Sequence, residues 1–375
     1  MLRPSSITCI QHMTTKQNID DSEYLVLNKM ACGYNYNRSM CISSKKLIGE
    51  IARLYNKEHC VITTSGLNAI SSLLNTLCIL YNVSPRINLI YSSELYTESP
   101  KLFKQLTKSY KNVVLHKFNI LNQLELENTY RMLSRGYINI LFVESCSNPN
   151  SIIFDFSIIP KLRAFSDNLY VVVDNTWLTH VCMNPFDHGA DFVLISTTKY
   201  YSGGQAIGGA IISGNILLKG VHDYNKINGL HVSPHNCDVL LSNLPTITDR
   251  ILRSAQLTQL VIGYLESNPK VLNVSNPFCK NHFSHDMASR FFKKINEQTI
   301  YPSVLTFQII GTKSKLKKVT KSSIIEYKTS FGSKMSRIDP YPYNIENVLV
   351  CRLSIGFDDI YERIVDGLQF IINNM

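Results

Sequence analysis

Two ionisable residues in the middle of the chain have types and positions that suit covalent chemistry. Asp174 ends one apolar run (169–174), and Lys199 follows the next (191–197). A lysine amine can bind an aldehyde or take a proton from carbon, and a nearby carboxylate can keep a ring nitrogen protonated. Taken alone, Asp174 could be a helix N-cap and Lys199 a surface lysine. Together with their neighbours, they favour a chemical interpretation.

This pair matches what pyridoxal 5′-phosphate (PLP) requires of a protein. PLP needs an amine for its aldehyde, a carboxylate for its pyridine nitrogen and donors for its phosphate. Ser196 and Thr198 stand beside Lys199 and are suitable phosphate donors, although they could merely end a strand. The sequence therefore predicts a PLP site with Lys199 as the Schiff-base lysine.

The elements that would position these residues alternate between apolar strands and helices. The expected strands are 60–64, 86–93, 113–118, 137–145, 169–175, 191–197 and 208–214, and the expected helices are 45–55, 66–81, a segment ending near 135, and 158–168. Continuously apolar strands alternating with helices predict an α/β fold with a mostly parallel sheet covered on both faces. Ligands gather at the carboxyl ends of such strands. Polar residues follow the expected strands there, at 64–66, 144–148, 174–175 and 196–199.

The pattern changes after about residue 230. A long helix is expected at 240–269, strands at 303–310 and 348–356, and a final helix at 359–372. This mixture predicts a smaller α+β domain. We therefore expect an N-terminal arm (1–44), a PLP-binding domain (45–230) and a C-terminal domain (231–375).

Residues 171–212 contain four motifs in a fixed order: DNT at 174–176, NP at 184–185, GAD at 189–191 and STTKY at 196–200. With these motifs, the segment resembles the Cys/Met metabolism family of PLP enzymes, which includes cystathionine γ-synthases, cystathionine β- and γ-lyases, methionine γ-lyase and O-acylhomoserine sulfhydrylases. The resemblance extends over about 34–372. It implies the fold of a fold-type-I PLP-dependent transferase, with PLP on Lys199 and its ring nitrogen at Asp174.

The resemblance also implies further contacts to the cofactor. Tyr36 and Arg38 match a family pair that reaches the phosphate of a neighbouring subunit. Ser65-Gly66-Leu67 matches a turn whose backbone N–H groups bind phosphate at a helix N-terminus. Tyr96 matches the ring that stacks on the pyridine, although core packing would also explain it. A dimer is then the minimum active unit, and a homotetramer is expected.

Three other positions are assigned by the same comparison. Glu144 and Asn148, in VESCSNPN, are expected near the ring. Arg352 is expected to hold the substrate α-carboxylate through a bidentate fork. Lys199, Tyr96 and Arg352 are therefore the predicted catalytic residues.

The chain departs from the family pattern in four segments. Cys41-Ile42-Ser43 replaces an N-P-T, Thr97-Glu98 replaces a Gly-Gly pair, and the loop at 203–206 looks one residue short. The family's S-L-G-G segment is matched only loosely, at 321–326. The resemblance therefore supports the cofactor residues better than the substrate residues.

The leading functional hypothesis is a lyase that cleaves a C–S bond by β- or γ-elimination, on an amino acid such as cystathionine. Replacement at the γ-carbon, as in cystathionine γ-synthase or the sulfhydrylases, uses the same cofactor residues and is the first alternative. The departures allow a second alternative, a paralogue that has lost catalysis and acts in binding or assembly.

Composition limits the other classes of function. The 375 residues are 45% hydrophobic with a net charge of +10. The lysines are dispersed, and the one dense run, 313–321, is expected to be a solvated face, so nucleic acid is not an expected partner. No apolar run is long enough to cross a bilayer, and no secretory signal is found. The ten cysteines form no CxxC pair or zinc-like cluster, which favours free thiols in a soluble cytoplasmic enzyme without a metal.

Overall fold

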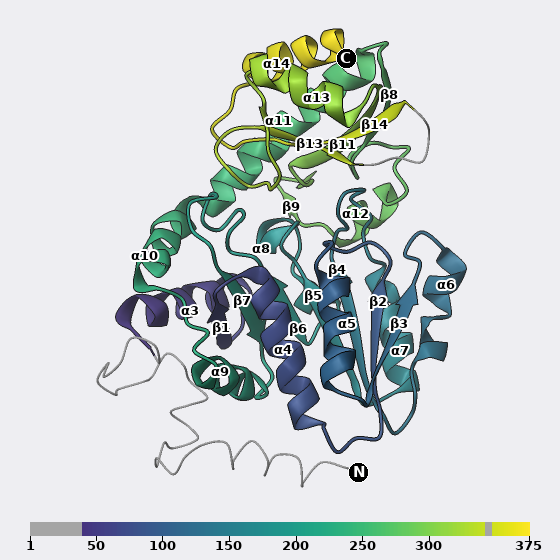
Figure 1. Ribbon diagram of the computed structural model, residues 1–375, viewed down its shortest axis with the longest axis vertical. Helices are drawn as coiled ribbons and strands as arrows, with labels where there is room; N and C mark the ends of the chain where they lie inside the picture. Colours follow the sequence, from purple (N-terminus) through teal and green to yellow (C-terminus); the bar gives the residue numbers. More distant parts are fainter. Residues whose placement is uncertain (1–39, 342–346) are drawn as a thin grey trace.

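The computed structural model describes residues 40–341 and 347–375 and contains two main sheets (Figure 1). The larger sheet has the strand order β1-β7-β6-β5-β4-β2-β3. Its strands are β1 (His59–Thr63), β2 (Ile87–Ser92), β3 (Val113–Phe118), β4 (Ile138–Glu144), β5 (Leu169–Asp174), β6 (Phe192–Ile195) and β7 (Gly209–Ser213). Strands β3, β2, β4, β5 and β6 are mutually parallel, whereas β7 is antiparallel to both β1 and β6. The expected mostly parallel sheet is confirmed.

Helices cover both faces of this sheet. They are α3 (Ile42–Leu54), α4 (Gly66–Leu80), α5 (Ser99–Ser109), α6 (Gln123–Glu127), α7 (Ile159–Phe165), α8 (Thr179–Cys182) and α9 (Leu218–Ile227), with 3-10 turns η1 (Thr129–Met132), η2 (Phe156–Ile158) and η3 (Pro185–His188). Strand β4 shows how the sequence produces this arrangement. Ile140 and Phe142 belong to one buried core, and Leu141 and Val143 belong to the core on the opposite face. A strand buried on both faces must be apolar throughout, as the sequence is here.

The smaller sheet has the order β12-β13-β14-β11-β8. Its strands are β8 (Val271–Ser275), β11 (Val304–Ile310), β12 (Glu326–Tyr327), β13 (Arg337–Tyr341) and β14 (Val348–Ser354); β9 (Lys294–Ile295) and β10 (Gln298–Thr299) form a separate hairpin. The accompanying helices are α10 (Pro234–Asn243), η4 (Leu244–Thr246), α11 (Ile247–Ser267), α12 (His285–Phe291), α13 (Lys313–Val319), η5 (Thr320–Ser322) and α14 (Tyr361–Asn374). In Figure 1 this sheet lies above one end of the larger sheet.

Helix α11 joins the two parts of the molecule. Ile251 and Ala255, in its first half, belong to a core of the larger sheet, whereas Ile262 and Leu265, near its end, belong to the core of the smaller sheet. One rigid helix thus fixes the smaller sheet relative to the larger one. The domain limits expected from the sequence remain a prediction, because this helix contributes to the cores of both sheets.

Three expectations about helices were wrong in detail. The segment ending near residue 135 contains only α6 and η1, not one helix. The long helix expected at 240–269 is divided by η4, which contains Pro245, a residue without the N–H that a continuous helix requires. Helix α5 was not expected, although Pro100 in its first turn is a favourable start signal.

Two expectations about surfaces can also be compared with the structure. In α13 the buried side chain is Leu316, and Lys313, Lys315, Lys317 and Lys318 are exposed, as expected of a solvated face. In the described parts of the chain, no helix is both long and apolar enough to span a membrane.

Candidate active site

The carboxyl ends of the central parallel strands bring three of the predicted residues together. Glu144 ends β4 and Asp174 ends β5, and the two are register partners. Lys199 follows β6, which is parallel to β5. Asp174 Oδ1 accepts a hydrogen bond from the Thr176 backbone N–H at 2.9 Å, and Glu144 Oε1 accepts one from the Tyr96 backbone N–H at 2.5 Å. These bonds fix both carboxyl groups at the sheet edge.

The two carboxyl groups are electrostatically unequal. Burial raises the pKa of Glu144 well above its usual range, and the neighbouring Asp174 charge raises it further. Burial also raises the pKa of Asp174, but the hydrogen bonds from Thr176 and the positive charge of Lys199 oppose this shift. Two buried carboxylates side by side cannot both ionise without a compensating cation. The surroundings therefore favour the proton on Glu144 and the negative charge on Asp174, which the positive charge of Lys199 stabilises.

The Lys199 amine is activated by its surroundings. Burial lowers its pKa from 10.5 to about 8, and the guanidinium groups of Arg352 and Arg337 contribute further, while Asp174 acts in the opposite direction. Nζ donates a hydrogen bond to Ser330 Oγ at 2.8 Å and lies 5.2 Å from the centroid of the Phe331 ring. A lysine with this pKa is partly neutral near neutral pH and can therefore react as a nucleophile or base.

The segment beside Lys199 corrects one expectation from the sequence. The loose S-L-G-G match at 321–326 lies on η5 and the start of edge strand β12. The segment that contacts Lys199 is Ser330-Phe331-Gly332-Ser333, which fits that pattern better. Gly332 has φ +73°, and a Cβ there would lie 2.6 Å from the Tyr200 backbone nitrogen, so only glycine permits this approach.

Arg352 lies on β14 and is only 4% exposed. One terminal nitrogen donates to Asn148 Oδ1 at 3.0 Å, and the other donates to Asp339 Oδ2 at 3.2 Å. The Tyr341 hydroxyl donates to the same Asn148 oxygen at 3.3 Å, and its ring centroid lies 5.2 Å from the guanidinium carbon. Among the described residues, Nε has no acceptor although it is buried. An unpaired buried guanidinium donor is suited to a carboxylate ligand.

Sequence reasoning missed Asp339, Tyr341 and Arg337, which all lie on β13. The register of the smaller sheet pairs Asp339 with Arg352, and this register could not be read from the sequence. The one signal in the sequence was Asp339, an isolated acidic residue in the segment SRIDP, which could have been considered as a partner for Arg352 on the predicted strand 348–356.

A close-packed turn lies at the N-terminus of helix α4. A Cβ on Gly66 would lie 2.6 Å from Ser196 Cβ. Any residue other than glycine at position 66 would therefore clash with the turn that precedes Lys199. Ser65 caps the helix, because its Oγ accepts the Asn68 backbone N–H at 3.1 Å. The N–H groups of Gly66 and Leu67 occupy the first turn and have no carbonyl partner within the helix. Such N–H groups form an anion-binding site.

Thr198 is held differently from the other predicted phosphate donors. Its hydroxyl donates to the Gly208 carbonyl at 3.1 Å and accepts the Gly208 N–H at 3.1 Å. The hydroxyl proton is therefore already used in closing the 198–208 loop. The phosphate role of Thr198 remains a prediction, and it requires this proton to change its acceptor.

Tyr96 follows β2, and the residue is 47% exposed. The two residues after Tyr96, which differ from the family's Gly-Gly pair, have a structural role. Glu98 is the N-cap of α5 and pairs with Lys101 at 2.8 Å, so the residues that replace the family's glycines begin a helix.

Tyr36 and Arg38 lie outside the described residues. Within the described ranges, no group of three or more His, Cys, Asp or Glu residues could hold a metal ion.

These features fit PLP as a ligand. The buried Asp174 carboxylate is stabilised by a cation, which a protonated ring nitrogen supplies. The turn at Gly66 provides phosphate donors, and the Lys199 amine has a lowered pKa for reaction with an aldehyde. The unpaired Arg352 Nε leaves a place for the carboxylate of an amino acid.

Comparisons with known proteins agree with this fit. A family model described as Cys/Met metabolism PLP-dependent enzyme matches residues 4–364. Mimosinase from Mimosa pudica is 25% identical over 91% of this chain and 76% of its own length. Cystathionine β-lyase from Coxiella burnetii is 27% identical over 90% of this chain and 85% of its own.

Solved structures show the same fold. Cystathionine γ-synthase from Xanthomonas oryzae superposes with a TM-score of 0.79 at 23% identity, covering 92% of this chain and 88% of its own. The methionine γ-lyase CalE6 from Micromonospora echinospora gives a TM-score of 0.78 at 20% identity, covering 90% and 88%. The expected fold-type-I architecture is confirmed. The chain therefore belongs to the Cys/Met metabolism family of PLP-dependent enzymes, and its cofactor is PLP.

Proposed function

We propose that the protein is a lyase that cleaves the C–S bond of an amino acid such as cystathionine, by β- or γ-elimination. The observation that carries this proposal is the Lys199 amine, whose pKa is lowered to about 8, at a site that also contains Asp174 and Arg352. Relatives named cystathionine β-lyase and L-methionine γ-lyase support the same class of reaction.

The cofactor-binding roles follow from the chemistry of each group. Lys199 would bind the aldehyde, and the Asp174 carboxylate would keep the ring nitrogen protonated. Neutral Glu144 would not repel the Asp174 carboxylate. The remaining proposed contacts are Ser196, Thr198, Ser65, Gly66, Leu67, Tyr96 and Asn148, together with Tyr36 and Arg38 from a neighbouring subunit. When bound, PLP supplies an electron sink for negative charge at the substrate α-carbon.

The substrate roles belong to Arg352 and Lys199. The Arg352 guanidinium would bind the α-carboxylate through Nε and one terminal nitrogen, which turns the α-carbon hydrogen towards the lysine. Neutral Lys199 Nζ would then take the α-proton as a general base and return a proton when the sulfur leaves. Ser330, which accepts a hydrogen bond from Nζ, would hold the amine in position for both transfers.

Product analysis tests this proposal directly. The purified protein is incubated with PLP, its absorbance spectrum is recorded, and L-cystathionine is added. Pyruvate with homocysteine indicates β-elimination, and α-ketobutyrate with cysteine indicates γ-elimination. The Lys199→Ala variant is the control. A protein that binds PLP but turns over no sulfur amino acid would overturn the lyase proposal in favour of a paralogue without catalysis.

Replacement at the γ-carbon is the second candidate. It is favoured by a relative named O-succinylhomoserine sulfhydrylase, from Pseudomonas aeruginosa, which is 24% identical over 83% of this chain. The test supplies O-succinyl-L-homoserine with either cysteine or sulfide. Formation of cystathionine or homocysteine, faster than keto-acid release, would make replacement the main activity.

Two further properties belong to the same proposal. The enzyme would act as a homo-oligomer, with a dimer as the minimum and a tetramer expected, because Tyr36 and Arg38 match residues that serve a neighbouring subunit. It would work in the cytoplasm, since all eight cysteines within the described ranges are buried free thiols. Light scattering of the active protein tests the first property, and an active monomer would contradict it.

A further inference from the structure

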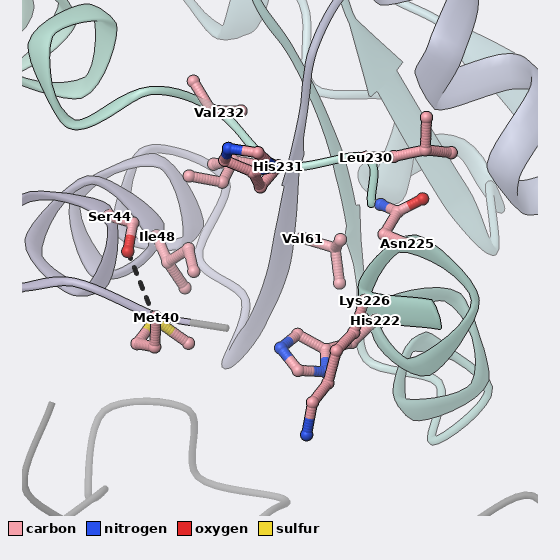
Figure 2. A pocket seen from close by; sticks show the side chains of 11 residues that line it. Met40, Ser44, Ile48, Val61, His222, Asn225, Lys226, Leu230, His231 and Val232 are labelled. Atoms are coloured by element: carbon pink, nitrogen blue, oxygen red, sulfur yellow. Dashed lines mark hydrogen bonds between the residues drawn. The ribbon is translucent and has the colours of Figure 1, made fainter. Parts of the chain in front are cut away.

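A pocket lies at the edge of the larger sheet, and none of the residues assigned to the active site lines it (Figure 2). Edge strand β1, helix α3, helix α9 and the segment after α9 form its walls. Its volume is about 50 Å³, which is enough for a few water molecules or for a small organic anion. None of its lining residues was assigned a role in binding the cofactor or the amino-acid substrate.

Asn225 contributes an unsatisfied donor to this pocket. The residue is 5% exposed, and its Oδ1 accepts a hydrogen bond from Ser72 Oγ at 2.6 Å, which fixes the orientation of the amide. Its Nδ2 has no acceptor among the described residues. Figure 2 shows the amide nitrogen directed towards the pocket side of α9. A buried N–H group without an acceptor is unfavourable, so the site favours a ligand that supplies one.

The other polar side chains at the pocket can all donate hydrogen bonds. Lys226 adjoins Asn225 on α9, and His222 lies one helical turn before Lys226 on the same face. His231 comes from the segment after the helix, and the described residues that line the pocket include no aspartate or glutamate. Asp223 lies next to the pocket, with its Oδ1 3.7 Å from His222 Nδ1. The lining therefore favours an anion over a cation.

The opposite wall is apolar. Ile48 of α3, Val61 of β1 and Val232 are all buried and contribute hydrocarbon surface to the pocket. A strongly hydrated anion such as phosphate gains nothing from such a wall, whereas an aliphatic chain does. The two walls together suit a ligand with an acceptor at one end and a short hydrocarbon chain at the other.

We propose that this pocket binds a small carboxylate with a short aliphatic chain. The carboxylate accepts a hydrogen bond from Asn225 Nδ2, the positive charge of Lys226 on the same helix favours its binding, and the chain lies against Ile48 and Val61. This site is independent of the active site, because its donors and its apolar wall belong to α3, β1 and α9.

Binding of butyrate to the PLP-loaded, full-length enzyme tests the proposal. Arg352 also attracts carboxylates, so titration calorimetry of the wild-type protein is expected to show two classes of site. Asn225→Asp replaces the unpaired donor with a carboxylate and should weaken one class by about tenfold or more, without affecting the other. Arg352→Lys should weaken only the other class, which separates this inference from the proposed catalytic function.

Lys226→Gln is a second test that does not depend on a buried substitution, because Lys226 is exposed. It should weaken the same class of site as Asn225→Asp by several-fold, whereas Lys317→Gln, on exposed α13, should leave both classes unchanged. Butyrate should bind more tightly than either butan-1-ol or inorganic phosphate. A single class of site that only Arg352→Lys weakens would overturn the proposal, as would equal binding by phosphate or butan-1-ol.

Discussion

The two sides of the active site are built in different ways. On the cofactor side, Glu144, Asp174 and Lys199 are placed by the ends of neighbouring strands in one parallel sheet, so the backbone register determines their spacing. On the substrate side, Arg352 is held by the side chains of Asn148, in the turn after β4 of the larger sheet, and Asp339, on β13 of the smaller sheet. Changes elsewhere in the chain therefore leave the cofactor side largely intact, while the substrate side depends on contacts between individual side chains.

The largest expected effect is at the centre of the cofactor side. Lys199→Ala removes the amine, and turnover should fall by about a thousandfold or more, because nucleophile and base are both lost. Lys199→Arg keeps the positive charge but cannot be deprotonated, so it should be equally inactive. Borohydride treatment followed by peptide mass spectrometry should locate the cofactor on Lys199. Turnover by the arginine variant close to that of the wild type would contradict the assignment.

The two carboxyl groups at the sheet edge should respond differently to loss of charge. Asp174→Asn keeps an acceptor for the Thr176 N–H but removes the negative charge, and kcat should fall by about a hundredfold. Glu144→Gln should cost much less, because burial and the neighbouring Asp174 charge raise the pKa of Glu144 and favour its neutral form. Measurement of kcat for both variants tests the assignment of the proton. The opposite ranking would mean that Glu144 is the charged member of the pair.

Substitution of Arg352 on the substrate side should change KM for the amino acid. Arg352→Lys replaces a planar fork by a single ammonium group, so KM for the amino acid should rise by about ten- to a hundredfold. The dissociation constant of PLP should remain unchanged. Arg337→Lys is the matched control, because Arg337 acts on Lys199 through its charge, which lysine retains. An equal increase in KM for both variants would show that Arg352 has no special part in binding substrate.

The same contrast explains how much the sequence could predict. The ends of apolar strands can be read from residue patterns, so the amino-acid sequence alone predicts that Asp174 and Lys199 lie together. The Ser330 contact and the Asp339–Arg352 pair could not be predicted. They depend on the register of β13 with β14 and on left-handed backbone at Ser330 (φ 83°) and Gly332 (φ 73°). Such features arise only when the smaller sheet is placed against the larger one.

The lowered pKa of Lys199 predicts how the apoprotein captures PLP as pH changes. Only the neutral amine reacts with an aldehyde, and this form predominates above the pKa of about 8. The capture rate should therefore rise by about tenfold per pH unit below pH 8 and level off above it. Stopped-flow absorbance measures the rate, with Nα-acetyl-lysine as the reference for titration of PLP itself. A rate that keeps rising towards the ordinary lysine pKa of about 10.4 would contradict the shift.

The smallest expected effect concerns the link between the two sides. Asp339 pairs with the Arg352 guanidinium, one of the two guanidinium groups that lower the pKa of Lys199, and would share that guanidinium with the incoming substrate. Asp339→Asn still offers an oxygen to Arg352 but no charge, so KM should fall by about threefold. The plateau of PLP capture should begin at lower pH, because the amine then faces a more positive site. The control is Asp249→Asn, on the exposed side of α11, which should change neither quantity. A higher KM with an unchanged pH profile would mean that Asp339 orients Arg352 for the substrate and does not compete with it.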